Sequence, residues 1–343
     1  MKVSDIVTGV MTNVKWKSIG LFFLCMIVLL CFVGSICFGV TDISFRDIIN
    51  AFRHYDETDS NHVIIKTTRL SRAIIALIIG ASLAIAGALM QALTRNPLAS
   101  PSIFGINSGA IFFVVLATIW FSSSSLVVYM WFAFFGAAIS AFIVYFLGSI
   151  GRDGIGPIKL VLAGAAISAL FNSFTQALLV MNEKGLQEVL FWLTGSVAGR
   201  TLDMLYPLLP FIFGAILLAF LITPALNIMM SGEDVAKGLG VRTTFVKVMV
   251  GLIVVCLAGA SVAVAGAIGF VGLIIPHIAR FLVGLDQRWV IAYSGCLGAI
   301  LLLIADISAR FFVYPAEIPI GVMTAFIGIP FFIYIVRKGV VNG

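Results

Sequence analysis

Charged side chains are scarce in this sequence, and hydrophobic side chains dominate it. Only 10% of the 343 residues are charged and 61% are hydrophobic, whereas a soluble protein carries about 25% charged residues. Several uncharged apolar stretches reach the roughly 20 residues that a helix needs to cross a bilayer. These stretches are too long for barrel strands and do not alternate as barrel strands do. The sequence therefore excludes a soluble fold and predicts an all-α polytopic membrane protein.

Several catalytic motifs are also missing. The sequence contains no Gly-x-x-x-x-Gly-Lys-Ser/Thr phosphate loop, so the chain does not bind and hydrolyse ATP by that mechanism. Active transport would therefore need a partner subunit or an ion gradient. Neither Gly-x-Ser-x-Gly nor His-Glu-x-x-His is present, which leaves an intramembrane hydrolase only His277 and Asp306 as candidate groups. We expect no catalytic residue in this chain.

Metal-ligand spacing and basic blocks are absent too. The positive charges are scattered singly, so the net charge of +6 does not indicate nucleic-acid binding. His277 has no second ligand close in sequence, and we expect it to be a hydrogen-bonded packing residue. We therefore expect neither a metal site nor a cofactor bound by this chain. The cysteines lie within apolar stretches and are expected to be small apolar fillers: Cys25, Cys31, Cys37, Cys256 and Cys296.

Hydropathy predicts about ten membrane spans. The expected spans cover residues 19–40, 70–92, 103–121, 126–148, 158–181, 205–228, 247–267, 270–283, 289–309 and 318–336. The third and the eighth are short or weak. The first follows Lys15 and Lys17 but is too long for a signal peptide and lacks a clear cleavage site, so we interpret it as a retained span. With the N-terminus inside, thirteen of the 21 lysines and arginines are cytoplasmic, which predicts that both termini are cytoplasmic.

One phrase occurs twice in the chain. Gly-Ala-Ser-Leu-Ala-Ile-Ala-Gly-Ala at 80–88 returns as Gly-Ala-Ser-Val-Ala-Val-Ala-Gly-Ala at 259–267, and nine of the 26 positions from 80 to 105 are identical at this offset. In the predicted topology the two copies cross the membrane in opposite directions. Such an inverted repeat is typical of transporters whose pathway lies between two related halves. We expect one permease domain over residues 1–343, with repeat halves at roughly 63–200 and 247–338; the alternative is chance similarity between two small-residue helices.

Motifs from the second span to the C-terminus resemble those of one transporter family. The stretches that carry the resemblance are Arg69-Leu-Ser-Arg72, Arg95-Asn-Pro-Leu-Ala99, Ser231-Gly-Glu-Asp-Val-Ala-Lys-Gly-Leu-Gly240, Gly266-Ala-Ile-Gly-Phe-Val-Gly272 with Pro276-His277, Asp306-Ile-Ser-Ala-Arg310 and Glu317-Ile-Pro-Ile-Gly321. Together they resemble the FecCD or BtuC-like permeases of ATP-binding-cassette (ABC) importers, which take up iron-siderophores, haem or vitamin B12.

The resemblance implies a complete transport system in the cytoplasmic membrane of a prokaryote. Two copies of this chain, or one copy and a sister permease, would enclose the channel. Two ABC ATPase subunits would bind ATP and Mg²⁺ on the cytoplasmic side, and an extracytoplasmic substrate-binding protein or lipoprotein would deliver the cargo. We expect a ferric siderophore, with haem or vitamin B12 as alternatives, and iron would be present only within the transported chelate.

The resemblance also implies where the partners bind. Residues 229–247 would hold a coupling helix that docks on the ATPase, although an ordinary solvated connector is the alternative. The implied coupling residues are Glu233, Asp234, Ala236, Leu239 and Gly240. Arg69, Arg72 and Arg310 would meet carboxylates of the substrate-binding protein, since arginine holds a carboxylate with two parallel hydrogen bonds; simple interface anchors are the alternative.

The spacing of Asp306 and Arg310 makes its own prediction. A carboxylate at membrane depth costs about 2.5–3.5 kcal/mol on insertion scales, so it should have a partner. Residues four apart share one helix face, and we therefore expect an ion pair between Asp306 and Arg310. An ion-coupled secondary transporter would instead need a carboxylate near the membrane midplane, and Asp306 lies too near the edge.

The inner gate and the pathway are less strongly marked. Pro97 forces the chain out of a helix, and the resemblance implies a narrowing at Asn96 and Leu98. A second gate loop is expected at 154–157, with Gly156 and Pro157. Polar residues in the spans are expected to line the pathway, or alternatively to form hydrogen bonds between helices: Gln91, Asn107, Asn172, Ser173 and Gln176.

Overall fold

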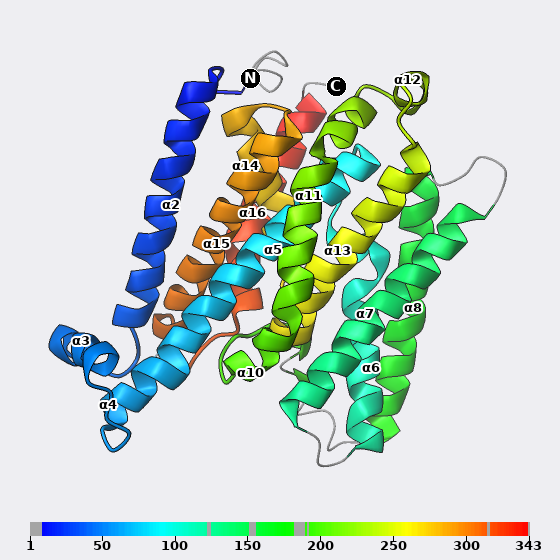
Figure 1. The fold of residues 1–343 in the computed structure, drawn as a ribbon. Coiled ribbons are helices and arrows are strands. Elements are labelled where there is room, and N and C mark those ends of the chain that lie inside the picture. Colours follow the sequence, from blue (N-terminus) through cyan, green and yellow to red (C-terminus); the bar gives the residue numbers. More distant parts are fainter. Residues whose placement is uncertain are drawn as a thin grey trace.

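The protein is a bundle of apolar helices (Figure 1). The computed structural model describes residues 9–121, 125–150, 156–181, 189–190, 192–313 and 316–341. Seven of the described helices are long and apolar enough to cross a membrane, and three shorter apolar helices accompany them. The ten are α2 (Val14–Cys37), α5 (Leu70–Thr94), α6 (Ile106–Trp120), α7 (Leu126–Ser149), α8 (Pro157–Met181), α11 (Leu209–Met230), α13 (Thr243–Ala265), α14 (Val271–Val283), α15 (Gln287–Phe311) and α16 (Ile320–Val341).

These helices confirm the hydropathy prediction. The two spans expected to be short are α6 and α14, with 15 and 13 residues. Shorter elements connect these helices: α3 (Phe45–Arg53), α4 (Ser60–Val63), a π-helix at Ile64–Arg69, 3₁₀ helices at Pro101–Phe104 and Tyr206–Leu208, α10 (Leu202–Leu205) and α12 (Glu233–Gly238).

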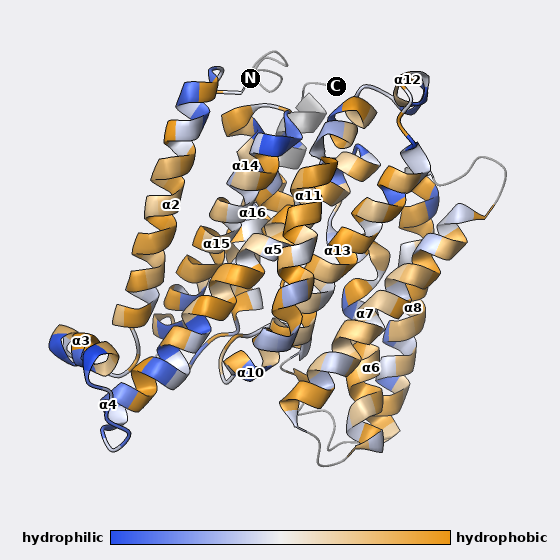
Figure 2. Cartoon of the chain, in the orientation of Figure 1, coloured by the Kyte–Doolittle hydropathy of each residue, from blue (hydrophilic) through white to orange (hydrophobic). Residues whose placement is uncertain are grey.

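The two ends of the bundle differ. The start of α2, the end of α16 and α12 lie together at one end, which we call the α12 end, whereas α3, α4 and α10 lie at the other, the α3 end (Figure 1). Hydrophilic residues gather toward both ends, and the shafts between them are mostly hydrophobic (Figure 2). This distribution is the one expected of a multi-pass membrane protein, whose lipid-facing shafts stay apolar.

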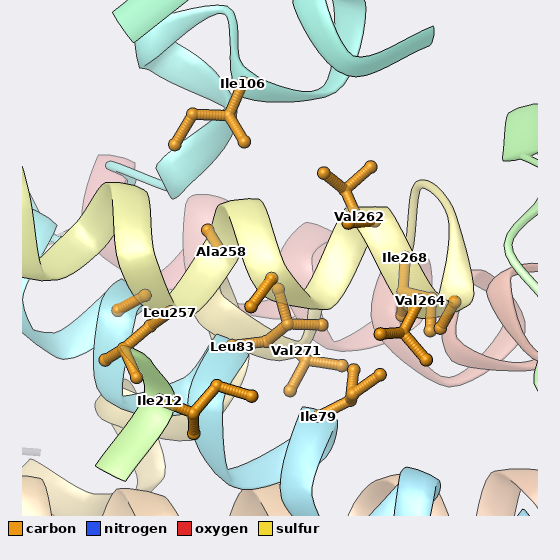
Figure 3. Packing of buried hydrophobic residues seen from close by; sticks show 14 of the residues in the cluster. Ile79, Leu83, Ile106, Ile212, Leu257, Ala258, Val262, Val264, Ile268 and Val271 are labelled. Carbon is orange, nitrogen blue, oxygen red and sulfur yellow. The ribbon is translucent and has the colours of Figure 1, made fainter. Parts of the chain in front are cut away.

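The repeated phrase lies in the centre of the bundle. In the most apolar windows of α5 and of α13, 72% of the residues are buried, compared with 11% in α2. The two helices run in opposite directions (Figure 1) and pack against each other. Figure 3 shows their side chains interlocked, with Ile79 and Leu83 of α5 beside Leu257 and Val264 of α13. The antiparallel arrangement fits an inverted repeat, and the division into two halves stays a prediction.

Glycines set the distance between the central helices. Gly80 lies against Gly298 of α15, and Gly87 lies against Gly272 of α14, so closely that a Cβ at either α5 position would overlap the facing carbonyl. Without a hydrophobic force to join helices in lipid, close backbone approach supplies the packing energy. The helix that carries the second copy of the repeated sequence ends inside that copy, whereas α5 continues beyond the first copy. Gly266, with φ of +74°, terminates α13 before α14 begins.

Candidate docking, coupling and pathway sites

A buried arginine–carboxylate cluster lies at the α3 end. Asp306 of α15 is fully buried between Arg72 of α5 and Arg310 of its own helix. Arg72 donates from Nη2 to Asp306 Oδ1 at 2.8 Å and from Nη1 to Glu317 Oε2 at 2.7 Å. Arg310 Nη2 contacts Asp306 Oδ2, which confirms the predicted i,i+4 ion pair. Burying a lone charge is costly, and here each carboxylate oxygen of Asp306 has its own guanidinium.

Two arginines of this region also hold the end of α2. Arg69 Nη1 donates to the carbonyl oxygens of Ile36 and Cys37 at 3.0 and 2.9 Å. Arg310 Nη1 donates to the carbonyls of Ser35 and Phe38 at 2.8 and 2.7 Å. The last carbonyls of a helix lack partners within the helix and attract cations. Neither arginine belongs to α2, so the ends of α5 and α15 are tied to it by these bonds.

These arginines are buried, whereas both predicted roles, a contact with the binding protein and an interface anchor, would place their side chains at the surface. Arg69, Arg72 and Arg310 are only 3%, 6% and 2% exposed. Their guanidinium groups are directed at groups of this chain, because the ends of three helices converge around Asp306. The charged group that reaches the surface is Glu317, whose side chain is 31% exposed. A contact between the arginines and a binding protein stays a prediction.

The expected coupling segment forms the short helix α12 at the opposite end. Glu233 Oε2 accepts from Lys247 Nζ at 2.8 Å, and Glu233 Oε1 lies 3.3 Å from Lys237 Nζ. The hydrogen bond from Lys247 keeps the pKa of Glu233 below its ordinary value. Because Lys247 belongs to α13, this pair fastens α12 to a central helix of the bundle.

One member of the predicted set of coupling residues, Ala236, is buried, and the other members reach the surface of α12. Glu233 is turned toward α13, and Ala236 is fully buried, with its carbonyl accepting from Val241 N at 2.9 Å. Ala236 therefore supports the helix from within. The side chain of Glu233 is paired with Lys247 but is also 36% exposed, so a contact between Glu233 and the ATPase stays a prediction. Exposed residues of this segment include Asp234, Leu239 and Gly240 of the predicted set, together with Val235, Lys237 and Gly238. Leu239 is 67% exposed and Val235 50%.

The predicted inner gate is an exposed turn at the α12 end of α5. Arg95, with φ of +50°, ends the helix, and Asn96 Oδ1 accepts from Leu98 N at 2.9 Å. Asn96, Pro97 and Leu98 are all exposed. Arg95 Nη2 donates to the carbonyl of Met229 at 2.7 Å, so the turn is bonded to the end of α11 just before α12. Sequence reasoning had assigned no role to Arg95.

The second gate loop is described only from Gly156. Pro157 begins α8, and the carbonyl of Gly156 accepts from Leu160 N at 3.1 Å. Residues 154 and 155 lie outside the described residues.

The candidate pathway residues fall into two groups. Gln91 is buried and donates to the carbonyls of Gly272 and Leu273 at 3.3 and 3.1 Å, while Arg280 donates to its Oε1. Its position matches the alternative of a hydrogen bond between helices, here α5 and α14. Asn107 is half-buried, and its Nδ2 lies 3.5 Å from Ser102 Oγ. By contrast, exposed polar side chains line one part of α8: Asn172, Ser173 and Gln176.

His277 lies against the ring of Phe331, with ring centroids 6.1 Å apart in an edge-on arrangement. Among the described residues no group of three His, Cys, Asp or Glu side chains could hold a metal ion.

The fold and these sites define a class of protein: a polytopic helical permease. The comparison with known families identifies the permease family. Residues 24–338 match the FecCD transport family, and the chain belongs to this family. It is 53% identical over 325 residues to the probable siderophore transport system permease YfiZ of Bacillus subtilis, covering 95% of this chain and 97% of that protein.

Other relatives and a solved structure agree with this membership. The chain is 43% identical to the Fe(3+)-citrate import permease YfmD of Bacillus subtilis, covering 93% of this chain and 95% of that protein. It is 35% identical to the Fe(3+) dicitrate permease FecC of Escherichia coli, with coverage of 91% and 94%. An inward-facing metal-chelate type ABC transporter has the same fold, with a TM-score of 0.81, 30% identity and coverage of 93% and 98%. The chain is thus a multi-pass membrane permease of the ABC transporter class.

Proposed function

We propose that this chain is the permease subunit of an ABC importer that moves ferric siderophores across the cytoplasmic membrane. The observation that carries the proposal is family membership over nearly the whole chain, together with relatives named for siderophore, citrate and hydroxamate iron uptake. Two copies, or one copy and a sister permease, enclose the pathway. The α12 end faces the cytoplasm, so both termini are cytoplasmic.

The surface of α12 supports an ATPase contact. Val235 and Leu239 expose apolar side chains at a hydrophilic end of the molecule, where lipid does not cover them. Exposed apolar residues within a polar rim are typical of protein–protein contacts. Closure of the ATPase dimer would pull α12, and the Glu233–Lys247 pair would transmit that movement to α13. The bond from Arg95 to Met229 connects the turn at 96–98 to the same region.

The cluster at the α3 end suggests how a binding protein docks. Arg72 has one buried carboxylate partner, Asp306, and one partly exposed partner, Glu317. A carboxylate of the arriving protein would therefore reach Arg72 by displacing Glu317, while Asp306 keeps the guanidinium in place. Arg69 and Arg310 would act by holding the surrounding helix ends. In this scheme docking exchanges one exposed ion pair for another and leaves the buried pair intact.

The amide-bearing face of α8 is the proposed pathway surface. Asn172 and Gln176 are exposed there, and uncharged amides let a bulky chelate slide without tight binding. An ion-coupled transporter is disfavoured, because Asp306 already contacts two arginines and has no free oxygen for proton coupling. Haem and vitamin B12 remain alternative cargoes within the family resemblance, and no residue described here favours them.

Reconstitution tests this proposal. The permease, its ATPase and its substrate-binding protein are placed in proteoliposomes, and uptake of ⁵⁵Fe bound to candidate siderophores is followed with ATP inside, with haem and vitamin B12 as competing cargoes. We expect uptake that requires ATP and all three components. Transport driven by an ion gradient through this chain alone would contradict the proposal. ATP-driven uptake of haem or vitamin B12 without siderophore uptake would show that the cargo is haem or vitamin B12 and not a ferric siderophore.

A further inference from the structure

A fourth buried arginine lies at the α3 end, in the segment between α8 and α11. Arg200 is 6% exposed, and its guanidinium carbon lies 4.1 Å from the centre of the Trp192 ring. Trp192 is itself 2% exposed and is packed edge-on against Tyr129 of α7, with centroids 6.2 Å apart. The indole thus forms a fixed platform for the guanidinium plane.

The donors of this pair lack acceptors. In the part of the chain that the structure describes, Trp192 Nε1, Arg200 Nε and Arg200 Nη2 are buried without a hydrogen-bond partner. Burial, which disfavours the charged form, lowers the pKa of Arg200 to about 10. Arg72 offers a comparison, because its Nε and Nη2 both reach Asp306 Oδ1, at 3.3 and 2.8 Å. Arg200 presents the same edge of its guanidinium, and no carboxylate of the described residues forms a hydrogen bond with it.

Backbone hydrogen bonds fix the position of this segment. Ser196 N donates to the carbonyl of Ala265 at 2.8 Å, and Ala267 N donates to the carbonyl of Trp192 at 2.8 Å. These bonds attach the segment to the turn between α13 and α14, and Gly321 N at the start of α16 donates to the carbonyl of Gly195 at 3.0 Å. The segment also follows α8, which carries the proposed pathway face. Arg200 lies just before α10 and therefore at the α3 end of the bundle (Figure 1).

We propose that Trp192 and Arg200 form a binding site for a carboxylate carried by the transported chelate. Nε–H and Nη2–H of one guanidinium edge are parallel and match the two oxygens of a carboxylate, and the indole N–H adds a further donor. The inference rests on the proposed function for the source of the carboxylate. The geometry alone calls for an anionic acceptor, since buried donors and charges are normally paired.

Binding to the purified importer tests the site. The permease and its ATPase are placed in nanodiscs without the substrate-binding protein, and thermal stability is measured against citrate and ferric citrate. We expect both to raise the melting temperature of the wild type, and Arg200→Gln to weaken their affinity at least about tenfold, the loss expected for a charged hydrogen bond. Trp192→Phe, which keeps the platform but removes one donor, should cause a smaller loss. Arg53→Gln, at an exposed arginine of α3, is the matched control and should change nothing.

A purely structural role for Arg200 predicts a different pattern. Removal of an unpaired buried charge should leave unliganded Arg200→Gln at least as stable as the wild type. Marked destabilisation of this variant, with citrate affinity unchanged, would overturn the proposal. A second result would also overturn the proposal: citrate does not change the melting temperature of the wild type, and Arg200→Gln weakens binding of the substrate-binding protein. The carboxylate that meets Arg200 would then belong to that protein.

Transport measurements separate this inference from the proposed function. Arg200→Gln should lose uptake of ferric citrate and keep uptake of a ferric trihydroxamate that lacks carboxylates. If the variant imports both chelates like the wild type, the site is refuted and the proposed function stands. If the wild type imports no ferric chelate at all, the proposed function fails.

Discussion

Removing the charge of Asp306 should destabilise the protein more than any other conservative change at the α3 end. The Asp306→Asn variant keeps the size of the side chain but leaves Arg72 and Arg310 buried without their shared counter-ion. Removing one partner of a buried ion pair typically costs about 3–5 kcal/mol. Glu317→Gln is the matched control, because its carboxylate is partly exposed and pairs of that kind contribute about 0–1 kcal/mol.

The assay is thermal unfolding of both variants in nanodiscs, with the double variant Asp306→Asn/Arg310→Met as a further arm. We expect a large fall in melting temperature for Asp306→Asn, a small fall for Glu317→Gln, and partial recovery in the double variant, since it buries one uncompensated charge fewer. Equal stability of the two single variants would refute the view that Asp306 organises this end of the bundle.

Three further predictions concern packing and coupling. Gly87→Ala places a methyl against the backbone of α14 and should lower stability by about 1–3 kcal/mol in thermal unfolding, whereas Gly214→Ala, which enters open space, should be neutral. Leu239→Asp should reduce co-purification of the ATPase and ATP-driven uptake without changing the amount of permease in the membrane; full uptake would show that the exposed face of α12 is not the contact. Because the hydrogen bond from Lys247 lowers the pKa of Glu233 from its ordinary 4.5, the stability from this pair is present at neutral pH and is lost as the pH falls below 4.5 through the lowered value. Lys247→Met should flatten that part of the stability profile, and an unchanged profile would mean that the pair contributes nothing.

The sequence predicted the spans well because each depends only on its own residues. A helix in lipid satisfies its own backbone and must be apolar along its length, so hydropathy locates it without knowledge of its neighbours. The Asp306–Arg310 pair was predictable for a similar reason, since both residues belong to one helix turn.

Contacts between helices were not predictable in this way. Arg72 and Asp306 are 234 positions apart in the chain, and nothing local indicates that the arginines turn inward. Gln91 was a candidate for the pathway because it is polar, but its partners on α14 determine its role. Ala236 was expected to meet the ATPase, and only the fold reveals that it faces its own chain. The role proposed for Arg200 was not predictable either, because a lone arginine becomes informative only once the fold reveals which described residues surround it.

Sidedness of α12 is the most direct test of the central claim that a separate ATPase drives this permease through that helix. In a background without the five native cysteines, Val235→Cys and Leu239→Cys are labelled with a membrane-impermeant maleimide, first in intact cells and then in inverted vesicles. We predict labelling only in inverted vesicles, and protection of both cysteines when the ATPase is bound. Labelling from outside intact cells would leave the ATPase no access to α12 and would contradict the account.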